Sequence, residues 1–143
     1  MTRVRHIGFV LVAAMLGSNA IAQELKPVVP QTAGFQSKPI LSSPITGVDG
    51  KEVVLISVTL APGASSPAHT HPGDCHVAVL EGTIELRVEG KEPRMMANGE
   101  AYSNLAGPVH QFANIGDKPA RLLNTLVVEK GKPRTVTQPA AAK

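Results

Sequence analysis

Apolar and polar residues alternate over short stretches of the chain. In the stretch 83–88, Ile84, Leu86 and Val88 alternate with polar residues. Successive side chains of a β-strand point to opposite faces, so this pattern predicts a strand with one buried face. Further strands are predicted at 40–45, 52–60, 75–80, 92–96, 100–104, 111–114 and 121–129.

Turn signals separate the predicted strands. Asp49-Gly50 is typical of a two-residue hairpin, and Asn98-Gly99 marks a second tight turn. We find no amphipathic helix of useful length after residue 22 and no internal repeat. Short strands at regular spacing indicate an all-β sandwich or closed barrel, and 143 residues suffice for one such domain.

The first 22 residues resemble a signal peptide. Arg3 and Arg5 precede an apolar run over 7–16, and Ala20-Ile21-Ala22 supplies small residues for a peptidase. The run is too short to span about 30 Å of hydrocarbon. We therefore expect cleavage after Ala22 and a periplasmic or secreted mature protein with no membrane segment.

The remaining chain divides into three parts. Residues 23–39 contain prolines and polar residues, and they predict a flexible N-terminal arm. Residues 40–130 hold the predicted β-barrel. Residues 131–143 are rich in Lys, Pro, Thr, Gln and Ala, and they predict a disordered C-terminal tail.

The charge does not indicate a nucleic-acid partner. The chain has 14 Lys and Arg against 11 Asp and Glu, and a pI of about 9.2. Removal of Arg3 and Arg5 with the signal leaves a net charge of only +1. No basic cluster is interleaved with aromatic residues, so nucleic-acid binding is not expected.

The histidines are the candidate chemistry. His69 and His71 lie one residue apart, so a strand places both on one face. His110 follows about forty residues later, and together the three suit a divalent transition metal such as Fe, Zn, Cu, Ni or Mn. The single cysteine, Cys75, cannot form an internal disulfide and lies inside the first cluster with His76.

Two blocks of sequence resemble the signatures of the cupins. The first runs from Gly63 through the two histidines and Cys75 to Gly82. The second runs from Gly99 through Gly107-Pro108-Val109-His110 to Asn114, with Leu105 where the family usually has proline. The resemblance implies a single cupin-type, jelly-roll-like barrel. Residues 127–133 and the His-Thr-His-Pro-Gly start also resemble small exported single-domain bacterial cupins.

The resemblance also implies the metal ligands. His69, His71 and His110 match the family's histidines, whereas Cys75 occupies the position of the usual glutamate. Either its thiolate is a fourth ligand, or three histidines leave more positions open, as in cupin-type thiol dioxygenases and some diketone-cleaving dioxygenases. Alternation turns Cys75 inward and His76 outward, although a bulge near Gly73 would exchange them and make His76 the ligand.

These features predict a small-molecule metalloenzyme, with a dioxygenase-like oxidoreductase as the first choice. The alternatives are a non-redox isomerase or decarboxylase, and a non-catalytic periplasmic module that binds a metal or small ligand. Exposed strand edges favour a homodimer. The expected apolar pocket lining comprises Val54, Ile56, Val58, Val77, Val79, Leu86, Met95, Phe112 and Leu123 or Leu126.

Overall fold

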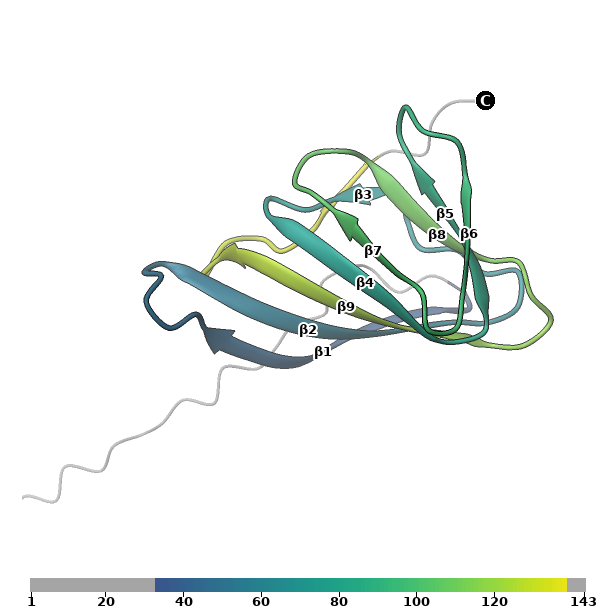
Figure 1. Ribbon diagram of the computed structural model, residues 1–143, viewed down its shortest axis with the longest axis horizontal. Coiled ribbons are helices and arrows are strands. Elements are labelled where there is room, and N and C mark those ends of the chain that lie inside the picture. The colour runs from purple at the N-terminus through teal and green to yellow at the C-terminus, as the bar shows by residue number, and fades with distance from the viewer. Residues whose placement is uncertain (1–32, 139–143) are drawn as a thin grey trace, which may run out of the picture.

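The structure is a computed structural model that describes residues 33–138, so the predicted signal peptide, residues 23–32 and residues 139–143 lie outside the described residues. Ten strands make up its regular structure (Figure 1). They are β1 (Phe35–Pro44), β2 (Lys51–Leu60), β3 (His69–Thr70), β4 (Asp74–Glu81), β5 (Thr83–Val88), β6 (Arg94–Ala97), β7 (Ala101–Asn104), β8 (His110–Asn114), β9 (Ala120–Glu129) and β10 (Val136–Thr137).

The strands form two five-stranded sheets, in the orders β1-β2-β9-β4-β7 and β10-β3-β8-β5-β6. The neighbouring strands in both sheets are antiparallel. This arrangement confirms the predicted all-β, cupin-type barrel. The described residues include no helix long and apolar enough to cross a membrane.

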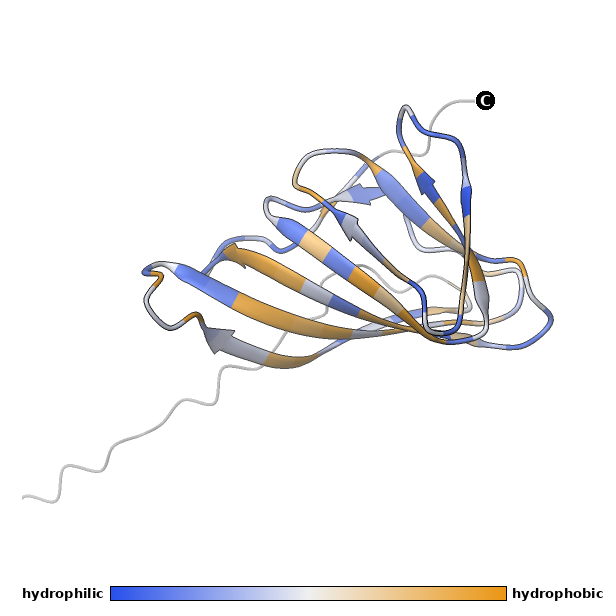
Figure 2. Ribbon diagram, viewed as in Figure 1, coloured by the Kyte–Doolittle hydropathy of each residue, from blue (hydrophilic) through white to orange (hydrophobic). Residues whose placement is uncertain are grey.

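Alternating side chains build the core between the sheets. Along β2, every second residue from Glu52 to Leu60 is buried, and β9 buries every second residue from Ala120 to Val128. Both strands carry long hydrophobic stretches (Figure 2). Their inward residues pack with Phe112 and Ile84 of the other sheet, so burial of apolar surface holds the two sheets together.

The N-terminal part of the barrel differs from its predicted form. The first strand begins at Phe35, not Ile40, so the boundary between arm and barrel was placed too late. In the first half of β1 every second residue is buried, and the strand forms one edge of its sheet. The two-residue hairpin at Asp49-Gly50 is also wrong, because residues 45–50 connect β1 to β2 through two turns with positive φ at Gly47 and Gly50.

The predicted disordered tail is wrong for residues 131–138. Val136 and Thr137 form β10, which pairs with Thr70 and His69 of β3. Composition alone favoured disorder here, but backbone hydrogen bonds to β3 order this segment. In Figure 1 the yellow C-terminal segment accordingly runs beside β3.

Gly73 allows the loop before β4 to approach the backbone of β9. A Cβ atom at this position would lie 2.0 Å from the carbonyl oxygen of Val127. Gly73→Ala should therefore destabilise the protein by about 1–3 kcal/mol, because backbone must move to relieve the overlap. Urea unfolding of Gly73→Ala and of the control Gly116→Ala, whose nearest contact is an ordinary 3.4 Å, measures the difference. Equal stability of the two variants would contradict this packing.

Candidate metal centre

Strand register brings the three predicted histidines together. His69 of β3 pairs directly with His110 of β8, and His71 follows His69 by two residues on the same face. All three are buried, and the nitrogen atoms that they offer lie within 4.8 Å of one another. Ring centroids are 4.3 Å apart for His69 and His110, and 4.9 and 5.1 Å apart for the other two pairs. This is a three-histidine group of the size that a single ion requires.

Backbone carbonyls hold the Nδ1 atom of each imidazole. Nδ1 of His69 lies 2.7 Å from the Pro67 oxygen, that of His71 lies 2.8 Å from the Arg134 oxygen, and that of His110 lies 3.2 Å from the Pro108 oxygen. A carbonyl only accepts hydrogen bonds, so Nδ1 of His69 and Nδ1 of His71 carry the proton and donate it. The lone pair of these two rings is therefore on Nε2, the tautomer that metal-binding histidines commonly use. Nδ1 of His110 also lies 2.6 Å from Nδ2 of Asn104, so this atom has two polar neighbours.

The Nε2 atoms of His71 and His110 are buried and have no hydrogen-bond partner within residues 33–138. Burial lowers the pKa of all three histidines, to about 4 for His71 and about 3 for His110, where the nearby histidines contribute further. The rings are therefore neutral near pH 7. Buried acceptors without donors are costly, and a divalent transition metal is the partner that neutral imidazoles suit. These residues fit such an ion.

The structure does not bring Cys75 or His76 into this group. Cys75 is completely buried in the hydrophobic core, and burial raises the pKa of its thiol to about 12. His76 is exposed on the outer face, where its Nδ1 lies 3.0 Å from Ser103 Oγ. Cys75 points inward and His76 outward, as alternation along β4 predicts. The bulge near Gly73 that would exchange the two residues is therefore absent. The register of β4 shifts instead between Val79 and Glu81.

A pocket opens on the histidine group between the two sheets. Its enclosed space is about 10 Å³, room for roughly one water molecule, and the pocket opens to solvent. Its lining combines apolar and polar side chains: Phe35, Ser37, Ile56, Val58, Ser66, His69, His71, Phe112, Asn124 and Thr135.

The expected lining is therefore correct only for Ile56, Val58 and Phe112. Met95 is 47% exposed because the next residue, Met96, takes the inward position of β6. On β9, Leu123 points away from the inward row. The remaining expected residues, Val54, Val77, Val79, Leu86 and Leu126, are buried in the core.

A family model described as a cupin domain matches residues 56–129. The chain belongs to the cupin superfamily. The matched segment contains both histidine blocks and eight of the ten strands in whole or part, from β2 to β9. The family predicted from the two sequence blocks is thereby confirmed.

Known proteins similar to this cupin have varied roles. Tetracenomycin polyketide synthase protein TcmJ of Streptomyces glaucescens is 32% identical over 86% of this chain and 78% of its own. The polyketide cyclase RemF from Streptomyces resistomycificus, a solved structure, has a TM-score of 0.60, with 24% identity over 78% of this chain and 77% of its own. An oxalate oxidase in complex with the substrate analogue glycolate has a TM-score of 0.62, with 23% identity over 75% of this chain and 56% of its own. The two structural matches establish the fold alone.

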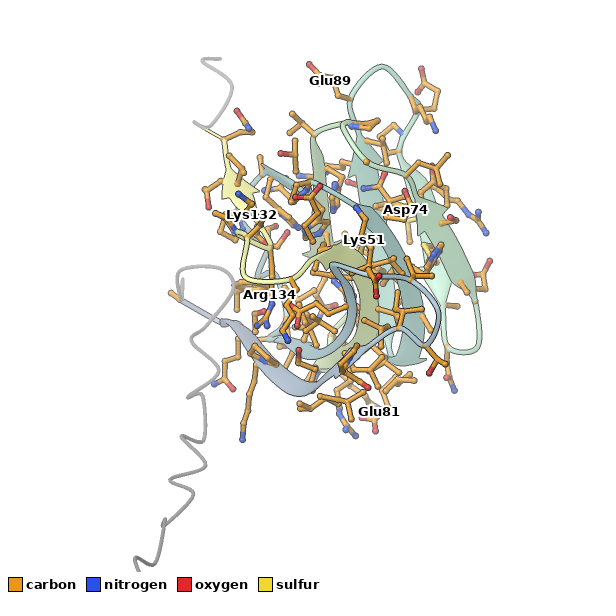
Figure 3. All side chains as sticks on the ribbon, turned by 90° about the vertical axis from the view of Figure 1, so that its left-hand side faces the viewer. Lys51, Asp74, Glu81, Glu89, Lys132 and Arg134 are labelled. Carbon is orange, nitrogen blue, oxygen red and sulfur yellow. The ribbon has the colours of Figure 1, made fainter. Side chains whose placement is uncertain are left out.

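The C-terminal segment of this cupin is part of the site. Besides the Arg134 carbonyl, the Thr135 hydroxyl lies 3.3 Å from Nδ1 of His71. The Arg134 guanidinium is paired with Glu52 of β2 at 3.2 Å, and Glu52 also accepts a hydrogen bond from Ser42 of β1. Figure 3 shows Arg134 on this yellow segment. A largely buried ion pair thus fastens the segment that orients His71.

Sequence reasoning missed three residues of the site. Asn104 Nδ2 lies 2.6 Å from His110 Nδ1, Arg134 acts through its carbonyl, and Asn124 lines the pocket. Asn124 alone had a sequence signal, as a polar residue within the otherwise apolar inward row of β9. Asn104 meets His110 of the other sheet, and Arg134 meets His71 from a distant part of the chain, and alternation reveals neither contact.

The structure predicts that three histidines suffice to hold a metal. After loading with Zn²⁺ and desalting, the wild type should retain near-stoichiometric metal by mass spectrometry. The His69→Ala/His110→Ala double variant should lose it. Cys75→Ser should retain it, because the Cys75 thiol lies outside the group, and His76→Ala is the matched surface control. Loss of metal from a folded Cys75→Ser variant would contradict the three-histidine site.

Removal of the C-terminal segment should weaken metal binding. A chain ending at residue 130 lacks the carbonyl that orients His71, and loss of such a supporting hydrogen bond typically costs about 10–100-fold in metal affinity. A chain ending at residue 138 keeps that carbonyl and serves as the control. Competition with a zinc-binding dye measures both affinities, and circular dichroism verifies folding. Equal affinities would show that residues 131–138 do not support the site.

Proposed function

We propose that this cupin is a metal-dependent enzyme that acts on a compact, oxygen-bearing small molecule. His69, His71 and His110 would hold one divalent transition metal. The observation that carries the proposal is the pair of buried Nε2 atoms without partners among the described residues, on rings whose Nδ1 atoms have polar neighbours. Such atoms gain a partner when an ion binds, which offsets the cost of burying them.

The donor set favours an open, reactive site over a closed structural one. A bound divalent ion supplies Lewis acidity and, if redox-active, a binding site for O₂. The group contains only three histidines, and a catalytic centre keeps positions free whereas a structural one is closed. Because neutral imidazoles add no negative charge, the site favours an anionic oxygen ligand such as an enolate. A non-catalytic binding module is therefore the weaker alternative.

The reaction class that we propose first is dioxygenase-like oxidoreduction. Ile56, Val58 and Phe112 form an apolar wall beside the histidines, which limits water around a reacting ligand. A non-redox reaction, such as isomerisation, decarboxylation or ring closure, is the second candidate. The similarity to the polyketide synthase protein TcmJ over 86% of this chain favours this second candidate.

We also propose that the protein acts outside the cytoplasm as a homodimer. The signal-like residues 1–22 support export. Strand β1 is a sheet edge that exposes Ile40 and Leu41 by 53% and 45%, and a second copy would cover them. Fractionation of expressing cells and light scattering of the mature protein test these two proposals.

Oxygen uptake decides between the two reaction classes. Protein loaded with Fe²⁺, Cu²⁺ or Zn²⁺ is mixed with β-diketones, catechols and thiols in an oxygen-electrode cell, and products are identified by mass spectrometry. We expect O₂ consumption only with Fe²⁺ or Cu²⁺ and none with the His69→Ala/His110→Ala variant. Product formation without O₂ uptake, equally with Zn²⁺, would instead establish the non-redox class. If the protein binds metal and ligand but forms no product, the non-catalytic binding module is the function that remains.

A further inference from the structure

Asn124 interrupts an apolar row that points into the barrel. On β9 the other inward residues are Ala120, Leu122, Leu126 and Val128, all completely buried. Asn124 is 95% buried by the same alternation, with only 5% of its surface exposed. Core positions of this kind are normally apolar, since burial of an amide without partners costs free energy.

The amide oxygen of Asn124 is buried and has no hydrogen-bond partner among the described residues. Two hydroxyl groups of the same pocket are paired. The Ser66 hydroxyl accepts from the Phe112 amide at 3.0 Å and donates to the Pro67 carbonyl at 3.1 Å, and the Thr135 hydroxyl contacts His71. Asn124 therefore offers an unused acceptor, as Nε2 of His71 also does.

Asn124 and the histidine group line the same pocket from different sheets. Asn124 belongs to the sheet of β9, whereas His69 lies on β3 of the opposite sheet, and both side chains line one pocket. Ile56 pairs with Asn124 in the neighbouring strand, and with Val58 it supplies apolar wall. A ligand between the sheets would meet imidazoles on one side and the amide on the other.

We propose that Asn124 is a substrate-binding residue that selects ligands with a hydroxyl group. The ligand class is a compact chelator whose adjacent oxygens reach the metal while a further hydroxyl donates to Oδ1 of Asn124. Apolar surroundings strengthen such a hydrogen bond and penalise a ligand that leaves the amide oxygen unpaired. This inference rests on the proposed function, because it assigns the substrate class of the same metal site.

The test uses two probes of equal shape. Pyrogallol and 3-methylcatechol carry the same chelating pair of hydroxyls, and they differ only by a hydroxyl or a methyl beside it. Calorimetry under nitrogen measures the affinity of each for Zn²⁺-loaded wild type, Asn124→Leu and Thr125→Val. Thr125 is the control because it is the next residue of β9 and points to the opposite face.

We expect wild type and Thr125→Val to bind pyrogallol about 5-fold more tightly than 3-methylcatechol, the value of one net hydrogen bond. Asn124→Leu should lose or reverse this preference. Without ligand, Asn124→Leu should unfold about 4 °C higher than wild type, because an unpaired buried amide is replaced by an apolar side chain. A purely structural asparagine, paired through an internal water, would instead lower the unfolding temperature when replaced.

Metal content of the same samples separates this inference from the proposed function. The role of Asn124 is overturned if Asn124→Leu retains Zn²⁺ and keeps the wild-type probe preference. It is also overturned if the protein retains Zn²⁺ but binds neither probe. In both cases the metal centre remains supported. A lower unfolding temperature for ligand-free Asn124→Leu overturns the role of Asn124 as well. Absence of Zn²⁺ from the wild type overturns the proposed function and this inference together.

Discussion

The register between β3 and β8 places His69 directly opposite His110, and the alternation of side chains then puts His71 on the same buried face. Three imidazoles consequently share a space that water barely reaches. Burial disfavours their protonation, and backbone carbonyls fix the proton of His69 and of His71 on Nδ1. Neutral rings with converging Nε2 atoms follow from these two effects, so the chemistry of the site originates in strand pairing.

The site is coupled to the edges of the barrel through the C-terminal segment. His71 donates to a carbonyl 63 residues away, and the side chain of the same arginine is paired with Glu52 of β2. Ser42 of β1 bonds to Glu52 in turn. One chain of polar contacts thus joins an edge strand, a central strand and a histidine ring, so that ring orientation depends on the closure of the whole barrel.

The replacement of the usual carboxylate ligand changes the electrostatics of this cupin. Cys75 is packed as a buried apolar residue with a raised thiol pKa, and it contributes no negative charge. The three-histidine group therefore retains more positive charge when an ion binds than a group with a carboxylate would. Together with the unpaired amide of Asn124 on the facing sheet, this suits an anionic, hydroxyl-bearing ligand over a cationic one.

The sequence by itself determined the strands other than β3 and β10, the family and the three histidines that meet. These are local properties: alternation over 83–88 or 121–129 reports one buried face, and the spacing of His69 and His71 reports a shared one. Tertiary structure alone decided the order of residues 131–138, the carbonyl partner of His71 and the pairing of Asn104 with His110. The first two outcomes rest on contacts between segments far apart in the chain. Asn104 and His110 are six residues apart, but they lie on strands of different sheets. Composition predicted a disordered tail because it carries no information about the strand edge at β3 that supplies the missing hydrogen bonds.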